Sequence, residues 1–177
     1  MSKIKVKNIK TELLSKQFYT LNKITFDYLI KNDEWVTQIR ECYDRGDGAG
    51  ILLYNKEKGT IILTRQFRMP TYMNDNHDGF LVEICAGLLE KDQTEACIIR
   101  ETEEGVGYRL KRVKKVYEAY SSPGVMTEKM HFFIGEYTDN MKVNAGGGLE
   151  CEHEDIEVLE LPFKEAIEML NTGKIED

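Results

Sequence analysis

The alternation of apolar and polar positions predicts β-structure throughout the N-terminal part of the chain. Residues 3–10 alternate, residues 18–30 are rich in aromatic and β-branched side chains, and residues 35–43 follow a turn at Lys31-Asn-Asp. We therefore expect a hairpin-forming β-sheet appendage here. The glycine-rich segment 44–50 predicts tight turns before the next strand.

The rest of the chain combines strand patterns with two helix patterns. One helix is predicted at 94–104, where Gly105-Val-Gly107 would stop it with a glycine in the left-handed cap conformation, and an amphipathic helix is predicted at 162–170. Strand patterns lie at 51–54, 60–67, 113–121, 129–137 and 156–161, and a polar, exposed loop at 74–79. Strands that flank helices in this order favour an α/β fold, an α/β/α sandwich around a mixed β-sheet.

Composition and charge narrow the classes of partner. At 177 residues the chain can bury one core, with or without an appendage. Its formal net charge of −7 argues against a nucleic-acid polymer as partner, although small nucleotides fit because a bound metal reverses the local sign. No apolar run is long enough for a membrane span and no signal-peptide pattern opens the sequence, so we expect a cytoplasmic protein with no membrane partner.

The cysteines do not form a recognisable motif. The four of them, at positions 42, 85, 97 and 151, lack a Cys-x-x-Cys pair, which is typical of reduced and mostly buried thiols. Cys151 and His153 could be read as two metal ligands, but structural zinc sites gather four ligands in recognisable spacings. We therefore favour ordinary cysteines over a disulfide framework or a zinc site.

The segment from Gly87 to Tyr108 carries the chemistry that the sequence makes visible. It closes a loop and opens a helix dense in carboxylates. Glu101 and Glu104 are three residues apart, which brings both side chains onto one helix face. Carboxylate oxygens there can bind Mg²⁺, or alternatively Mn²⁺, and substrate phosphates can complete the coordination shell. The pattern indicates a phosphoanhydride substrate.

This segment resembles the box of the Nudix hydrolase superfamily, G-x5-E-x7-R-E-U-x-E-E-x-G-U, where U is bulky and apolar. The matching positions, aligned from the right, are Arg100, Glu101, Thr102, Glu104, Gly107 and Tyr108. The loop between Gly87 and Arg100 is one residue shorter than the general pattern. Gly105 stands where the family has the second paired glutamate, a principal metal ligand. Glu103 is a poor substitute, since a shift of one residue turns a helical side chain by about 100°.

Over essentially the whole chain, the sequence is similar to the GDP-mannose hydrolases of this superfamily, a nucleotide-sugar branch related to the ADP-ribose pyrophosphatases. The segments that carry the similarity are 18–21, 40–46, 65–68, 85–89, 122–124, 131–133, 144–148 and 154–162. The resemblance implies a Nudix fold, with an N-terminal β-sheet region at 1–46 for dimerisation and substrate binding and a hydrolase domain at 47–177. It also implies a homodimer in which the N-terminal sheet of one subunit helps to build its neighbour's site.

Candidate site residues follow from the same resemblance, position by position. Substrate contacts would come from Phe18, Arg40, Glu41, Arg68, Ala86, Gly87, Leu88 and Glu128. Metal ligands would be the carbonyl of Ala86 together with Glu101, Glu104 and Glu154, and the catalytic carboxylates Glu154 and Glu101, with Glu152 as the fallback for Glu154. Phe18 would stack on the base, and the guanidinium fork of Arg68 suits phosphate. His131 is expected to pack within an apolar strand and not to catalyse.

Two classes of function follow. The first is a metal-dependent pyrophosphohydrolase, most similar to enzymes that split GDP-mannose into GMP and mannose 1-phosphate, with ADP-ribose as the second substrate to consider. The other is a catalytically weakened Nudix-fold protein that binds a nucleotide sugar, because Gly105 removes an expected metal ligand. A third reading treats Gly105 as an incidental substitution in a competent enzyme.

Overall fold

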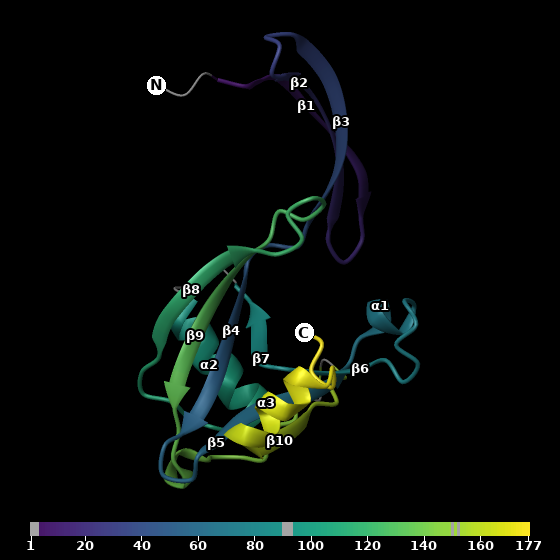
Figure 1. Cartoon of the computed structure of the whole chain (residues 1–177). Helices are drawn as coiled ribbons and strands as arrows, with labels where there is room; N and C mark the ends of the chain where they lie inside the picture. The colour runs from purple at the N-terminus through teal and green to yellow at the C-terminus, as the bar shows by residue number, and fades with distance from the viewer. Residues whose placement is uncertain (1–3, 90–93, 150, 152) are drawn as a thin grey trace. The chain divides into compact units, whose positions relative to one another are not determined.

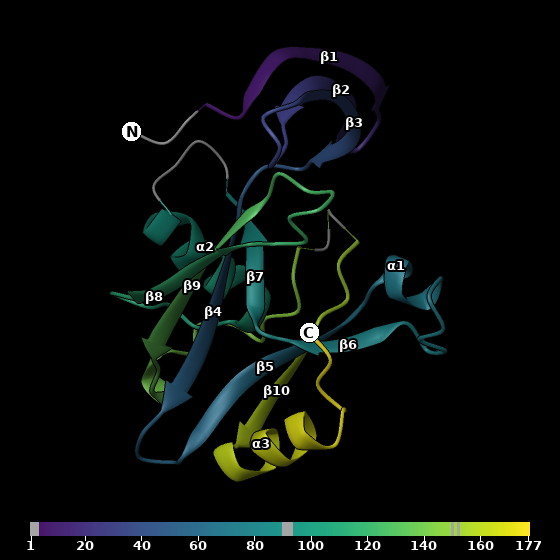
Figure 2. The same cartoon turned by 45° about the horizontal axis from the view of Figure 1, so that its top comes forward.

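The structure is a computed structural model that describes residues 4–89, 94–149, 151 and 153–177. Its chain divides into two compact units. One comprises the N-terminal segment up to Asp47 together with residues 119–130. The other comprises Gly48–Glu118 and His131–Asp177. Figures 1 and 2 label the elements of both units.

The N-terminal unit is an antiparallel sheet of three strands in the order β1-β2-β3. The strands are β1 (Val6–Lys16), β2 (Thr20–Leu29) and β3 (Trp35–Asp44), as the alternating pattern predicted. Strand β1 continues to Lys16, beyond the predicted limit at residue 10, and its register against β2 shifts twice. The sheet is thin, and most side chains of β1 are exposed.

Residues 119–130 attach to the end of β3 by backbone hydrogen bonds. The amide of Tyr43 donates to the carbonyl of Val125 at 2.7 Å, and the amide of Thr127 donates to the carbonyl of Tyr43 at 3.1 Å. The amide of Lys129 donates to Oδ1 of Asp47 at 2.9 Å. These bonds between segments far apart in the sequence explain why the two belong to one unit.

The second unit contains a larger sheet with the path β10-β5-β4-β9-β8, to which β6 adds by pairing with β5 and β7 by pairing with β4. Its strands are β4 (Gly48–Asn55), β5 (Thr60–Phe67), β6 (Phe80–Glu83), β7 (Cys85–Leu88), β8 (Lys114–Tyr120), β9 (Lys129–Glu136) and β10 (Glu157–Pro162). Its helices are α1 (Met69–Tyr72), α2 (Thr94–Val106) and α3 (Phe163–Asn171), with a 3₁₀ turn, η1, at Asp139–Met141.

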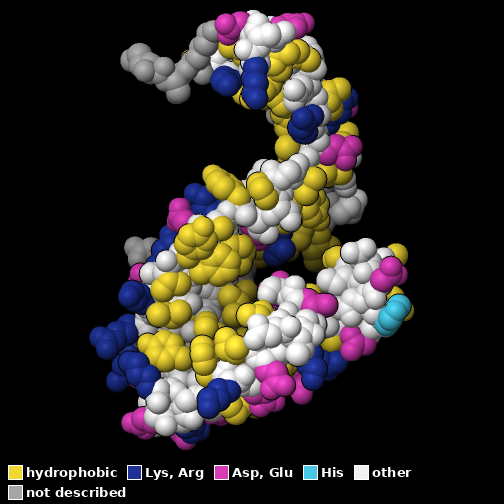
Figure 3. All heavy atoms as spheres, viewed as in Figure 1, with side chains coloured by type: hydrophobic (Ala, Val, Ile, Leu, Met, Phe, Trp, Pro, Cys, Tyr) yellow, Lys and Arg dark blue, Asp and Glu magenta, His cyan; other side chains and the backbone are white. Residues whose placement is uncertain are grey.

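Helices cover both faces of this sheet, so the predicted layered α/β architecture is confirmed. On one face, Ile98 and Val106 of α2 pack with Ile51, Leu53 and Phe133 of the strands. On the other face, Ala166 of α3 packs with apolar side chains of β5 and β10. Figure 1 shows α2 and α3 on opposite sides of the strands. Apolar side chains also reach the surface, and Figure 3 shows them on the visible face of this unit.

Three local predictions differ from the structure. Strand β4 begins at Gly48, inside the segment predicted to turn, because glycine admits the close packing of Ile84 against Gly50. Strands β6 and β7 were not predicted, since four residues are too few for a pattern. Helix α2 ends at Val106, beyond the predicted limit at residue 104, and of the two glycines in Gly105-Val-Gly107 it is Gly107, with φ of +81°, that has the left-handed conformation.

Candidate functional site

The predicted substrate-binding residues of the N-terminal unit lie on its surface. Phe18 is 94% exposed at the turn between β1 and β2, with its ring edge-on to Tyr19. Arg40, on β3, donates to Oε1 of Gln38 at 2.8 Å and to the carbonyl of Ile39 at 2.7 Å. Glu41 lies next to it on the same strand and is exposed. These side chains are available to a ligand.

Glu128 has a different environment. It is 3% exposed, and its Oε1 lies 3.3 Å from Nε of Arg45. The guanidinium of Arg45 in turn lies 5.5 Å from the ring centre of Tyr19. The carboxylate predicted to contact substrate is therefore bound to an arginine that sequence reasoning did not select. Its own role is still a prediction.

In the second unit, α2 presents Glu101 and Glu104 on one face, as their spacing predicted. Both carboxylates are partly buried, and both form ion pairs with the guanidinium of Arg100. This group lies 3.2 Å from Oε1 of Glu101 and 3.5 Å from Oε2 of Glu104. The arginine limits the repulsion between two carboxylates that lie one turn apart. Oxygen ligands for a hard cation are thus present as a pair.

Glu101 packs against the backbone of Gly87, the first residue of the box. A Cβ added to Gly87 would lie 2.3 Å from the carboxyl carbon of Glu101, so a larger residue would displace the carboxylate. The preceding residue, Ala86, is exposed on β7, which pairs with β4. The carbonyl of Ala86, predicted as a metal ligand, therefore belongs to the strand segment against which Glu101 lies.

Glu154 lies on the loop between η1 and β10, which is hydrogen-bonded to the end of α2. Its Oε2 accepts the amide of Leu149 at 3.0 Å, and it packs so closely on Gly148 that a Cβ there would lie 2.5 Å from this oxygen. The amides of Gly147 and Gly148 donate to the carbonyls of Gly105 and Glu104 at 3.0 and 3.2 Å. The loop thus links the last turn of α2 to Glu154. Glu152, the predicted fallback, lies outside the described residues.

Burial and the charges of both predicted catalytic carboxylates affect the pKa of the Cys85 thiol. Burial raises the pKa of Cys85 to about 12, and the charges of Glu101 and Glu154 act in the same direction. The Sγ of Cys85 also lies 3.6 Å from the backbone carbonyl oxygen of Glu101. Cys97 is also buried, whereas Cys42 is half-buried and Cys151 exposed, so the expectation of mostly buried thiols holds for two of the four.

The position of the missing ligand borders this thiol. A Cβ on Gly105 would lie 3.3 Å from Sγ of Cys85, within the helix and without any unusual backbone angle. Glu103 cannot take over without breaking another interaction, since it forms two 2.7 Å hydrogen bonds with Arg109. Among the described residues, no three His, Cys, Asp or Glu side chains gather closely enough to bind a metal by themselves.

The predicted ligands still fit a divalent cation that is bound jointly by protein oxygens and by the phosphates of a substrate. Two carboxylates on one helix face, a backbone carbonyl beside them and a further glutamate supply oxygens, which Mg²⁺ and Mn²⁺ prefer. Mg²⁺ characteristically retains water and takes only one or two protein carboxylates when a phosphate is present. A metal site completed by substrate phosphates therefore does not require three clustered side-chain ligands.

Arg68, predicted to bind phosphate, has a partner that sequence reasoning missed. Its Nε and Nη2 donate to the two oxygens of Glu83 at 2.8 and 2.6 Å. Glu83 is 8% exposed. The signal was present in the sequence, because a lone carboxylate inside the apolar run from Phe80 to Ile84 requires a buried partner.

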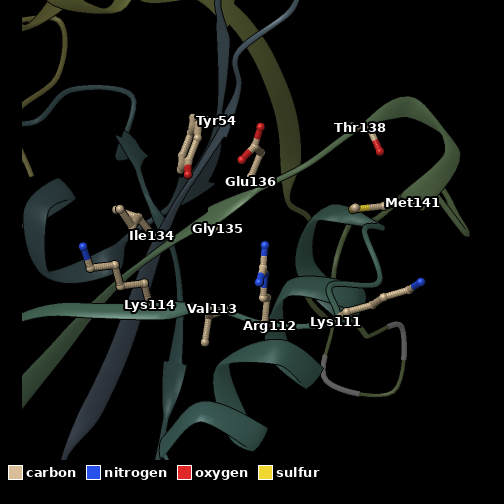
Figure 4. A pocket seen from close by; sticks show the side chains of 10 residues that line it. All are labelled: Tyr54, Lys111, Arg112, Val113, Lys114, Ile134, Gly135, Glu136, Thr138 and Met141. Carbon is tan, nitrogen blue, oxygen red and sulfur yellow. The ribbon is translucent and has the colours of Figure 1, made fainter.

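A separate groove in the second unit is lined by none of the predicted site residues. Figure 4 shows the side chains that line it: Tyr54, Lys111, Arg112, Val113, Lys114, Ile134, Gly135, Glu136, Thr138 and Met141.

His131 packs in β9, with its side chain 13% exposed and Nδ1 3.6 Å from Glu118. In the described part of the chain, no helix has the length and apolar character that crossing a membrane requires.

Comparisons with known proteins agree with this geometry. Residues 5–43 match the family described as the GDP-mannose pyrophosphatase NudK N-terminal domain, and residues 44–176 match the NUDIX domain. A GDP-mannose pyrophosphatase of Pectobacterium atrosepticum is 55% identical over 96% of this chain and 86% of its own length. One from Escherichia coli O139:H28 is 53% identical over 96% of this chain and 87% of its own.

A solved structure supports the fold independently of close sequence similarity. The crystal structure of an ADP compounds hydrolase superposes with a TM-score of 0.71 at 16% identity, and the match covers 100% of this chain and 89% of that one. The matched NUDIX domain spans most of the chain, and it contains α2, Gly87 and Glu154. The chain therefore belongs to the Nudix hydrolase family.

Proposed function

We propose that the chain is a divalent-metal-dependent pyrophosphohydrolase that cleaves GDP-mannose to GMP and mannose 1-phosphate. The observation that carries the proposal is that two predicted catalytic carboxylates lie on different elements of a Nudix domain: Glu101 lies on α2 against Gly87, and Glu154 lies on the loop between η1 and β10 that is hydrogen-bonded to the last turn of α2. The substrate comes from relatives that share more than half of their aligned residues with this chain and are named for it.

The chemistry assigns separate tasks to these residues. Glu154 accepts a proton from a water molecule whose oxygen forms a new bond to phosphorus, while the bridging P–O bond breaks and its oxygen leaves with the other phosphate. Arg68 binds the phosphate charge with its guanidinium. Glu101, Glu104 and the carbonyl of Ala86 would hold Mg²⁺ or Mn²⁺, which neutralises charge that develops on the phosphates.

A direct assay tests this proposal. The purified chain is incubated with GDP-mannose and Mg²⁺, and GMP release is followed, with EDTA as the metal-free control. We expect Glu154→Gln and Glu101→Gln each to lower kcat by roughly 100- to 10,000-fold, the range for loss of a positioned acid or base. Glu136→Gln, on an exposed ion pair with Lys56, should retain the wild-type rate. Full activity in both site variants would disprove the assigned site.

Gly105 favours one second candidate, a protein that binds the nucleotide sugar with little turnover. The glycine removes a carboxylate that the family uses on the metal, and Glu103 is engaged by Arg109. In this case calorimetry would detect GDP-mannose binding while the assay detects no GMP. Testing ADP-ribose in the same assay shows whether the chain hydrolyses this alternative substrate instead of GDP-mannose.

The active form is proposed to be a homodimer in the cytoplasm. Its N-terminal sheet exposes large apolar side chains on β1, on β3 and at the turn before β2, among them Leu13, Ile39 and Phe18. Large apolar side chains exposed on a three-stranded sheet favour burial against a second copy. Four free cysteines favour a reducing compartment.

A further inference from the structure

Arg68 directly follows β5, and Glu83 ends β6, the strand that pairs with β5. The register joins Thr64 to Glu83 and Phe67 to Phe80, so Arg68 follows the last paired residue of β5. The side chain of Arg68 extends toward Glu83 and donates hydrogen bonds to both of its carboxylate oxygens. Oε2 of Glu83 also accepts a hydrogen bond from Nε of Arg68 at 3.2 Å, and the hydroxyl of Thr64 donates to the backbone carbonyl of Glu83 at 3.3 Å.

The two partners differ sharply in exposure. Glu83 is almost completely buried, whereas 42% of the side chain of Arg68 is exposed. Its Nε and Nη2 face Glu83, and no hydrogen bond to Nη1 occurs among the described residues. One edge of the planar guanidinium is thus occupied, and its other edge is open.

Stability alone does not require such a pair. A buried ion pair contributes little or nothing beyond well-packed apolar side chains of similar size, because desolvation offsets the attraction between the charges. A fixed guanidinium with one open edge has a further use, since it binds a phosphate without losing side-chain entropy at that moment. The hydrogen bonds to Glu83 raise the pKa of Arg68, and the charges of Asp177 and Glu154 add to this.

We propose that Glu83 is a positioning residue that holds the open edge of Arg68 toward the substrate phosphate. The inference deepens the proposed function and rests on it, because it takes the nucleotide sugar as the ligand of Arg68. Glu83 would act only through Arg68 and would not touch the substrate. It also lies three residues before Ala86, so one short segment fixes both the arginine and the predicted metal-binding carbonyl.

Steady-state kinetics of Glu83→Gln test the role. Glutamine keeps the shape but weakens the charge-assisted bonds, so we expect KM for GDP-mannose to rise about tenfold or more while kcat changes less than about threefold, as for lost uniform binding. Arg68→Ala should raise KM at least as much. In the Arg68→Ala background, adding Glu83→Gln should have no further effect. Glu136→Gln is the control for removal of a paired carboxylate elsewhere.

Chemical rescue distinguishes positioning from a structural role. Millimolar guanidinium should restore part of the lost affinity of Arg68→Ala, because Glu83 still binds the added cation, and should restore none in the double variant. Thermal melts verify that each variant is folded. Additive effects on KM, or equal rescue with and without Glu83, would overturn the inference even if the variants are fully folded.

Calorimetry with GDP-mannose separates this inference from the proposed activity. If the wild-type chain binds but does not release GMP, the proposed hydrolysis fails, and the dissociation constants of the same variants still decide the role of Glu83. If the wild-type chain neither binds nor hydrolyses GDP-mannose, both the proposed function and this inference are overturned.

Discussion

At the scale of single residues, Gly105 separates this chain from the pattern of its family. Its backbone is helical, so no glycine-specific conformation explains it, and Gly107 provides the cap. Its immediate neighbour is the Sγ of Cys85, 3.3 Å from where a Cβ would lie. A side chain at this position must therefore share space with a buried thiol.

Restoring the glutamate should reveal how much the site depends on it. We expect Gly105→Glu to raise kcat by roughly 100-fold or more, since a metal ligand contributes several kcal/mol of charge stabilisation. Adding Cys85→Ala makes room and should raise the melting temperature of Gly105→Glu. The measurements are GMP release and thermal unfolding, with Cys85→Ala alone as the control. An unchanged rate in both glutamate variants would mean that the chain builds its site without this ligand.

At the scale of elements, a polar network joins three parts of the larger sheet. The hydroxyl of Tyr137, after β9, lies 3.0 Å from Oε1 of Glu160 on β10 and 2.7 Å from the hydroxyl of Thr60 at the start of β5. Lys58, in the turn before β5, lies 3.2 Å from the same glutamate oxygen. Tyr137 is fully buried, so its hydroxyl depends on these partners.

This network predicts a stability optimum between acid and alkaline limits. Burial favours a higher pKa for Glu160, but hydrogen bonds from Lys58, Tyr137 and Thr60 outweigh it and lower the pKa below 4.5. Its contribution is therefore present above pH 4.5 and is lost as the pH falls further. Burial raises the pKa of Tyr137 from 10.0 to about 12, so this contribution is present below pH 10 and is lost above it.

Thermal melts between pH 3 and 11 check both limits. Glu160→Gln should flatten the decline on the acid side, and Tyr137→Phe the decline on the alkaline side. Glu157→Gln, on the same strand but with its side chain 58% exposed, is the matched control for removal of a carboxylate. Identical pH profiles for wild type and Glu160→Gln would show that other groups set the acid limit.

The sequence predicted the elements better than the contacts between them. The longer strands and the helices α2 and α3 were predicted in the correct order, because alternation and helical spacing are local signals, whereas the short elements α1, β6 and β7 were missed. The shared face of Glu101 and Glu104 followed from helix geometry. The pairing of Arg68 with Glu83 depends on the β5–β6 register, which no local pattern encodes. The contact of Glu101 with Gly87 likewise depends on how α2 packs on β7.

At the scale of the whole molecule, the N-terminal sheet is the part whose stability needs explanation. Trp35, Ile39 and Tyr43 alternate along β3 and so share one face, with exposures of 38, 54 and 37%. Such a row of large apolar side chains is unfavourable in water. The proposed homodimer would remove it from solvent.

Analytical ultracentrifugation of Ile39→Glu tests the dimer. A carboxylate in the centre of this row should shift the chain from dimer to monomer at micromolar concentration, because a charge buried without a partner is strongly unfavourable. Lys16→Glu, at the exposed end of β1, introduces the same side chain in the same sheet and should leave the dimer intact. A wild-type chain that sediments as a monomer would contradict the proposal.

The loop between η1 and β10 also constrains how the sequence can vary in length. Two consecutive amides, of Gly147 and Gly148, are committed to carbonyls at the end of the helix, and the next, of Leu149, is committed to Glu154. An insertion or deletion within 144–149 would put these donors out of register, whereas one between Leu149 and Glu154 would leave the amides of Gly147 and Gly148 on their helix carbonyls. Length differences among homologues should therefore concentrate in that second interval, immediately before the proposed catalytic base.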